Sequence, residues 1–113
     1  MTDTNGTTHL SSVQAETLRQ ELQEQLSRRS NQLAGLQAAA SEGSGADDTW
    51  QELLVNIAAA DRAIAELGQA LERLSEGTYG RCSHCETGIP FERLKIRPLA
   101  RYCIGCQRRH EAA

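Results

Sequence analysis

Apolar side chains recur every three or four residues along two long segments of the chain. In the first segment, from about Ser12 to Ala40, the steps between them are 4, 7, 3 and 4 residues, and Arg29 occupies one core slot. The apolar positions are Leu22, Leu26, Leu33, Leu36 and Ala40. This spacing is a heptad seam, which predicts a helix with one apolar stripe.

The second segment shows the same stripe more regularly, with steps that alternate between three and four residues. Its apolar positions are Trp50, Leu53, Ile57, Ala60, Ile64, Leu67, Leu71 and Leu74. The pattern stops at "SEGTYG", where Gly77 is suited to end a helix because glycine readily adopts the left-handed conformation of a C-cap. Each segment is therefore predicted to be a helix roughly 40 Å long at about 1.5 Å per residue.

Between the two segments lies "SEGSGADD", residues 41–48, whose glycines, serines and aspartates predict a turn. Two helices of similar length joined by a short turn are expected to pack antiparallel, seam against seam. The predicted fold class is mostly α: a long antiparallel helical hairpin, or coiled coil, with its tip at about residues 41–48. The same seams could pair with a second chain, but the short turn and the matched arms favour an intramolecular hairpin and a monomer.

Three parts are expected along the chain. Residues 1–10 are polar and without periodicity, which predicts a disordered N-terminal tail, and Ser11 or Ser12 could cap the helix that follows. The coiled-coil hairpin is expected at residues 11–76. Residues 77–113 contain all four cysteines and end in a stretch long enough for a short C-terminal helix.

Composition indicates that a large core is not the main source of stability. Hydrophobic residues make up 39% of the chain and aromatic residues 4%, which suggests that a metal, a coiled coil or a partner contributes. The formal charge of −3 combines twelve acidic and five basic side chains in residues 1–80 with three acidic and seven basic ones in residues 81–113. The acidic hairpin argues against direct nucleic-acid binding. No apolar run of membrane-spanning length and no secretory leader is visible, so a cytoplasmic protein without a membrane partner is expected.

The cysteines form two Cys-x-x-Cys pairs separated by seventeen residues: Cys82, Cys85, Cys103 and Cys106. This spacing is typical of a structural zinc site, because two thiolates on each of two turns can complete a tetrahedron around one ion. Four thiolates leave no open coordination position, and no phosphate loop or Ser/His/Asp constellation is visible, so an enzyme is not expected. His84 as a substitute ligand and a redox use of the thiols are the alternatives.

The cysteine-bearing stretch "GTYGRCSHCETGIPFERLKIRPLARYCIGCQ", residues 77–107, closely resembles the zinc-finger signature of the DksA/TraR family. The shared features are the Gly-Thr-Tyr-Gly lead-in, Ile89-Pro90, Arg93-Leu94, Arg97-Pro98-x-Ala100 and the final Cys-x-x-Cys-Gln. The fold of that family, a helical hairpin followed by a four-cysteine finger, agrees with the order predicted above. The resemblance is specific over the finger and is one of architecture over the hairpin.

The resemblance implies a bacterial transcription regulator that binds RNA polymerase directly and inserts the hairpin tip into its secondary channel. Acidic tip residues of the family act near the catalytic magnesium. Better-known members carry an Asp-x-x-Asp-x-Ala tip, whereas this chain has adjacent Asp47 and Asp48, followed at a short distance by Trp50. Partner contacts of the tip are expected at these three residues, although an aspartate could also cap the second helix and Trp50 could fill the seam. A zinc-stabilised adaptor or a nucleic-acid-binding zinc ribbon, without a role in the polymerase channel, is the alternative.

Overall fold

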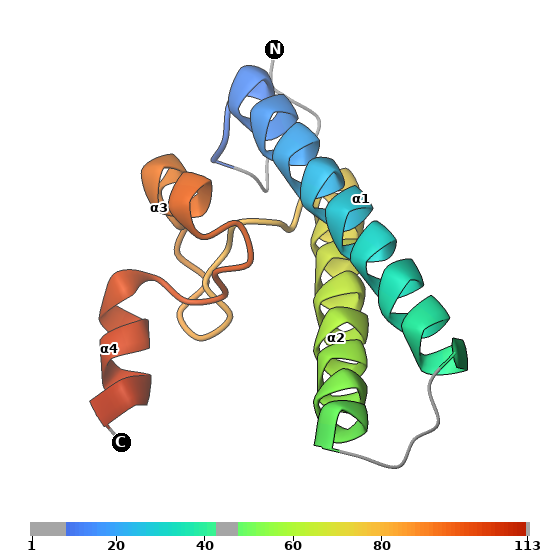
Figure 1. Ribbon diagram of the computed structural model, residues 1–113. Helices are drawn as coiled ribbons and strands as arrows, with labels where there is room; N and C mark the ends of the chain where they lie inside the picture. Colours follow the sequence, from blue (N-terminus) through green and yellow to red (C-terminus); the bar gives the residue numbers. More distant parts are fainter. Residues whose placement is uncertain (1–8, 43–47, 113) are drawn as a thin grey trace.

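Four helices make up the regular structure of residues 9–42 and 48–112, the residues that the computed structural model describes (Figure 1). The long helices α1 (Ser12–Glu42) and α2 (Asp48–Glu76) pack against each other, and the short helices α3 (Phe91–Ile96) and α4 (Ile104–Ala112) follow them. The molecule measures 59 × 35 × 19 Å along its principal axes. The predicted class, a mostly α protein built on a helical hairpin, is confirmed.

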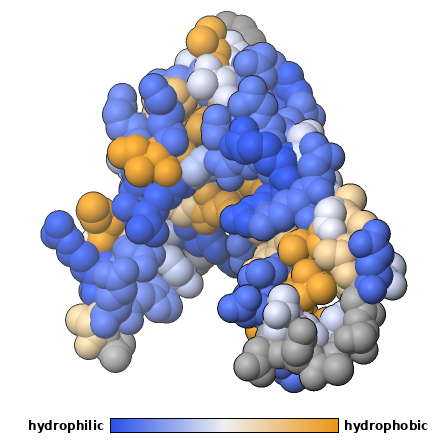
Figure 2. Space-filling view, in the orientation of Figure 1, coloured by the Kyte–Doolittle hydropathy of each residue, from blue (hydrophilic) through white to orange (hydrophobic). Residues whose placement is uncertain are grey.

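The two long helices pair along the predicted seams. Every apolar seam position of α1 and α2 is buried or half-buried, and the face seen in Figure 2 is mostly hydrophilic. Arg29 does not fill a core slot: its side chain is exposed, and its Nη1 donates to Oε1 of Gln32 at 3.1 Å. Placing Arg29 in the seam was therefore wrong, because a guanidinium buried without a partner would cost several kcal/mol. In the described part of the chain no helix has the length and apolar character needed to span a bilayer.

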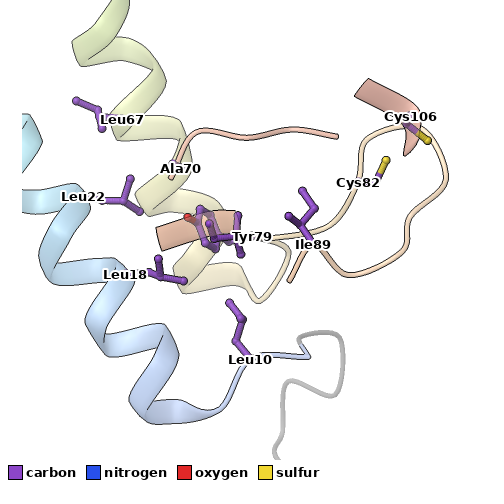
Figure 3. Close-up of a cluster of buried hydrophobic side chains, with 10 residues drawn as sticks. Leu10, Leu18, Leu22, Leu67, Ala70, Tyr79, Cys82, Ile89 and Cys106 are labelled. Atoms are coloured by element: carbon purple, nitrogen blue, oxygen red, sulfur yellow. The ribbon is translucent and has the colours of Figure 1, made fainter. Parts of the chain in front are cut away.

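The hairpin and the C-terminal segment share one apolar core at the end of the hairpin where α2 finishes (Figure 3). Its buried hairpin members are Leu18, Leu22, Leu67 and Ala70, and its buried members from the following segment are Tyr79, Cys82, Ile89, Leu94 and Cys106. Burying one leucine side chain contributes about 1.5–3 kcal/mol. This core therefore fixes the C-terminal segment to the base of the hairpin.

A capping box begins α1. The Oγ of Ser11 accepts a hydrogen bond from the backbone N–H of Gln14 at 3.0 Å, and Oε1 of Gln14 accepts one from the N–H of Ser11 at 3.1 Å. Of the two serines proposed as caps, Ser11 is the one that caps the helix. The reciprocal bonds satisfy two donors that the helix itself cannot pair.

The end of α2 is built on Gly77, as the sequence predicted. Gly77 has a φ of 82°, its N–H donates to the carbonyl of Leu74 at 3.3 Å, and the N–H of Thr78 donates to the carbonyl of Arg73 at 2.9 Å. These two bonds are those of a Schellman motif, which needs a left-handed residue at this position. The motif turns the chain out of the helix and directly into the cysteine-bearing segment.

Residues 9 and 10 contradict the prediction that a disordered tail extends to residue 10. Leu10 is 6% exposed and belongs to the shared core, and Nε2 of His9 lies 2.6 Å from the carbonyl oxygen of Ile89. The His9 ring covers Gly88, where an added Cβ would come within 2.7 Å of ring atoms. Because His9 and Ile89 are eighty positions apart, no local pattern could report the contact. The rest of the predicted tail, residues 1–8, lies outside the described residues.

Candidate metal centre and hairpin tip

The first cysteine pair sits on a tight loop. Arg81 and Gly88 form an antiparallel bridge, and inside it the N–H of Cys82 donates to the carbonyl of Thr87 at 2.9 Å. The N–H of Glu86 donates back to the carbonyl of Cys82, also at 2.9 Å, and Glu86 has a φ of 65°. These bonds turn the backbone between them, so that the thiols of the pair lie on one side of the loop.

The second pair lies where α4 begins. Cys103 directly precedes the helix, and its carbonyl accepts the N–H of Gln107 at 2.8 Å, which places Cys106 in the first turn. The N–H of Ser83 donates to the carbonyl of Arg101 at 2.7 Å and joins this pair to the loop of the first pair. Two segments about twenty residues apart are thereby brought together.

The four sulfur atoms lie within 4.8 Å of one another, and the Sγ atoms of Cys85 and Cys103 are 3.8 Å apart. For a metal–sulfur distance of about 2.3 Å, the edge of a regular tetrahedron is about 3.8 Å. All four thiols are free of disulfide bonds. The group therefore has the composition and size of a site for one tetrahedral zinc ion, with no position open to a substrate.

The surroundings of the sulfur atoms differ between the two pairs. Burial opposes ionisation of the Cys82 thiol, but backbone N–H groups, among them those of Cys85 and His84, outweigh it and lower the pKa to about 5. Burial raises the pKa of Cys106 to about 11, although Nη2 of Arg109 donates to its sulfur at 3.3 Å. A bound zinc ion would displace the remaining thiol protons, and Arg109 would offset part of the negative charge of a four-thiolate site.

His84 is not part of the metal-binding group found among the described residues. Its side chain is exposed, and its contribution to the site is the backbone N–H, 3.4 Å from the sulfur of Cys82. Thr87, whose Oγ1 lies 3.2 Å from the sulfur of Cys85, supports the site and was missed by the sequence analysis. Arg109 is one of the basic residues that follow the cysteines in the sequence, and screening of the four thiolates by such residues was expected. It lies three positions after Cys106 and so on the same face of a helix.

Of the predicted tip residues, Trp50 is described in full, and it lies in the first turn of α2, at the end of that helix away from the turn that leads into the finger (Figure 1). Asp47 lies outside the described residues. The helix α2 begins at Asp48, and the side chain of Asp48 is likewise outside the described part. Trp50 is half-buried at the first seam position of α2 and takes part in an interaction within the chain. Partner contact at Asp47, Asp48 and Trp50 therefore stays a prediction.

The fold and the cysteine group together define a class of protein, a C4-type zinc finger attached to a helical hairpin. Comparison with protein families identifies the class more closely: residues 77–112 match the prokaryotic dksA/traR C4-type zinc finger. The resemblance to the DksA/TraR family is thus confirmed over the finger, and zinc is confirmed as the cofactor of a finger of this type.

Curated relatives share the same part of the chain. An uncharacterised protein of Aquifex aeolicus is 42% identical over 57 residues, which cover 50% of this chain and 39% of that protein. The RNA polymerase-binding transcription factor DksA of Caulobacter vibrioides is 38% identical over 50 residues, which cover 44% of this chain and 35% of that protein. The chain thus spans less than two fifths of the length of these relatives.

Solved structures extend the likeness to the hairpin. The transcription factor DksA2 from Pseudomonas aeruginosa superposes with a TM-score of 0.82 at 25% identity, over 92% of this chain and 88% of that one. The structure of the RNA polymerase binding protein and transcriptional regulator Dks from Chlamydia trachomatis gives a TM-score of 0.56 at 18% identity, over 91% and 93%. At 18% identity, the likeness to the Chlamydia trachomatis structure concerns the fold alone. Hairpin and finger are therefore arranged as in DksA proteins.

Proposed function

We propose that this chain is a non-enzymatic transcription regulator that binds RNA polymerase, with its hairpin tip in the secondary channel and a zinc finger at its base. The observation that carries the proposal is the whole-chain likeness to the DksA2 structure, together with a finger of the dksA/traR type. RNA polymerase binding is named for the Caulobacter relative, and the proposal transfers it to this chain. A polymerase partner implies a cytoplasmic location.

The distribution of charge along the hairpin supports insertion of its tip. Residues 30–41 of α1 carry no charged side chain, and residues 49–60 of α2 carry Glu52 alone. Ala34, Ala38 and Ala58 in these stretches are exposed, so the outer surface of this part is formed largely by small or neutral groups. A slender shaft with a single charged side chain can enter a confined channel while leaving few charges desolvated and unpaired. It would carry the carboxylates of Asp47 and Asp48 beyond it.

The zinc ion, in this proposal, is bound by Cys82, Cys85, Cys103 and Cys106 and serves the structure. When bound, it supplies a fixed tetrahedral link between two loops that have little apolar area of their own. Cys82 and Cys106 are both buried in the shared core, so the link also positions the finger against α1 and α2. The buried residues of the shared core orient the hairpin relative to the finger, and in this proposal the finger docks on the polymerase.

The experiment compares purified polymerase with the zinc-loaded chain and two double variants. Asp47→Asn with Asp48→Asn removes the tip charges. Asp61→Asn with Glu66→Gln removes the same charge from two exposed positions away from the tip, at the middle and in the basal half of α2. We expect all three proteins to bind polymerase and the tip variant alone to lose its effect on transcription initiation. Absence of a complex with the unaltered chain would refute polymerase binding, and equal loss in both variants would refute a role for the tip.

A further inference from the structure

A second site of interest is a cavity of about 240 Å³ between the last turn of α2 and the finger. Three arginines from separate segments line it: Arg73 of α2, Arg81 before the first cysteine pair and Arg101 before the second. Glu86 is the one carboxylate in its lining, to which the consecutive residues from Thr78 to Ser83 also contribute. The charged side chains around the cavity therefore carry an excess of positive charge.

The backbone at each arginine is held by hydrogen bonds. The carbonyl of Arg73 accepts the N–H groups of Thr78 and Tyr79 at 2.9 and 3.2 Å, and the carbonyl of Arg101 accepts the N–H of Ser83 at 2.7 Å. The side chain of Arg81 is also fixed, because its Nη1 donates to the backbone carbonyl of Glu86 at 3.2 Å. The three cationic groups thus sit on a rigid frame formed by the Schellman turn and the cysteine loops.

An alternative explanation for basic residues near four thiolates is that they only offset the negative charge of the metal site. In this chain that role falls to Arg109, which donates to the sulfur of Cys106. The sulfur of Cys82, the cysteine that lines the cavity, accepts the backbone N–H groups of His84 and Cys85. Within the described residues neither Arg73 nor Arg101 forms an ion pair. Two of the three guanidinium groups are therefore available to a ligand.

We propose that this cavity, the arginine pocket of Arg73, Arg81 and Arg101, binds a phosphate group. Its volume is below the roughly 300–1,000 Å³ of sites for drug-sized ligands, which suits a single oxyanion or the terminal phosphate of a larger molecule. Guanidinium groups bind phosphate oxygens through paired, charge-assisted hydrogen bonds. A tetrahedral phosphate presents enough oxygens for three such groups, whereas a carboxylate presents two. The proposal does not depend on polymerase binding.

The test is a titration of the zinc-loaded, ¹⁵N-labelled full chain with inorganic phosphate, monitored by NMR. A parallel titration with sodium chloride at matched ionic strength is the control. We expect saturable shifts of the backbone amides of Gly80, Ser83 and Arg101 with phosphate and none that saturate with chloride. Arg81→Gln with Arg101→Gln should weaken binding roughly tenfold or more, because hydrogen bonds to charged groups are lost. Glu86→Gln should strengthen binding, since it removes the one carboxylate from the lining.

The matched control is Arg108→Gln, an exposed residue of α4 outside the cavity lining. It should change the affinity by less than about twofold, because a solvent-exposed charge at a distance is screened by salt. Adenosine 5′-monophosphate and adenosine, titrated in parallel, identify the source of the phosphate. Tighter binding of the nucleotide than of phosphate, with no binding of adenosine, would indicate a nucleotide; equal binding would indicate the free ion.

Three results would overturn the proposal: shifts that do not saturate, shifts that chloride reproduces, or equal weakening by the control variant. Zinc content and the amide spectrum of the shared core verify that each variant is folded. If the double variant fails this check, Arg73→Gln is measured in its place, because Arg73 lies on α2 and outside the cysteine loops.

Discussion

The two ends of the hairpin are stabilised in different ways. At the base, Leu18, Leu22 and Leu67 are almost completely buried in the apolar core that the hairpin shares with the finger. In the half nearer the tip, the seam residues Leu33 and Leu36 of α1 are half-buried. There α1 packs against α2, and neither leucine belongs to the core shared with the finger. The base therefore has the three-dimensional core of a small domain, while the distal half is a two-helix coiled coil. Stability is concentrated where the metal lies, and the part proposed to enter the polymerase is left slender.

Removal of zinc is expected to have the largest effect on this contrast. Structural zinc in small fingers contributes on the order of 10 kcal/mol to folding, so chelation should unfold the finger and open the shared core. Hydrogen exchange should then accelerate at Leu22 and Leu67 far more than at Leu36. Mass spectrometry of the holo and the chelated protein measures these exchange rates. An unchanged rate at Leu22 after chelation would contradict a core that depends on the metal site.

Matched leucine truncations compare the two ends directly. Leu22→Ala should cost about 2–5 kcal/mol, because it opens a cavity in a fully buried site. Leu36→Ala removes a half-buried side chain from a thinner layer and should cost about 1 kcal/mol. Urea unfolding of the holo protein measures both, and equal losses would show that the core is not concentrated at the base.

A pair of glycine substitutions separates helix termination from helix propensity. Gly77→Ala should cost about 1–2 kcal/mol, because alanine would occupy the left-handed conformation that ends α2. Gly35 lies inside α1 with nothing within 4 Å of an added Cβ, so Gly35→Ala should stabilise by about 0.5–1 kcal/mol. Thermal unfolding followed by circular dichroism reports both signs. A stabilising Gly77→Ala would be inconsistent with the Schellman motif.

The smallest effect is expected at the hydroxyl of Tyr79, which donates to the carbonyl of Pro98 at 2.8 Å. Tyr79→Phe should cost about 1 kcal/mol at neutral pH. Burial raises the pKa of Tyr79 to about 12 from an ordinary value of 10.0, so folding favours the neutral phenol. The unaltered chain should keep this contribution below pH 10 and lose stability as the pH rises towards 12, relative to the Phe variant. Parallel pH dependence of the two proteins would exclude this linkage.

Local patterns in the sequence predicted the features that local physics determines. The seams of α1 and α2, the end of α2 at Gly77 and the grouping of the four cysteines follow from spacing and backbone preference, and the structure confirms them. The contact of His9 with Ile89 and the arginine pocket join segments that are far apart in the chain. Such contacts depend on how the elements pack, so residue spacing carries no signal for them. Arg29 was misplaced because the heptad spacing fixes the position of a residue on the helix but not the direction that a long side chain takes from it.

The central claim is that the tip enters the polymerase while the zinc-bearing base stays outside its channel. It is tested most directly by site-specific photocross-linking of the holo protein to polymerase. A benzoylphenylalanine placed at Thr49, exposed in the first turn of α2, should cross-link to residues around the polymerase active centre. The same group at Gln69, exposed in the basal half of α2, should cross-link to the outer rim of the channel. Cross-links from Thr49 to the outer surface alone, in a complex that still forms, would contradict the account.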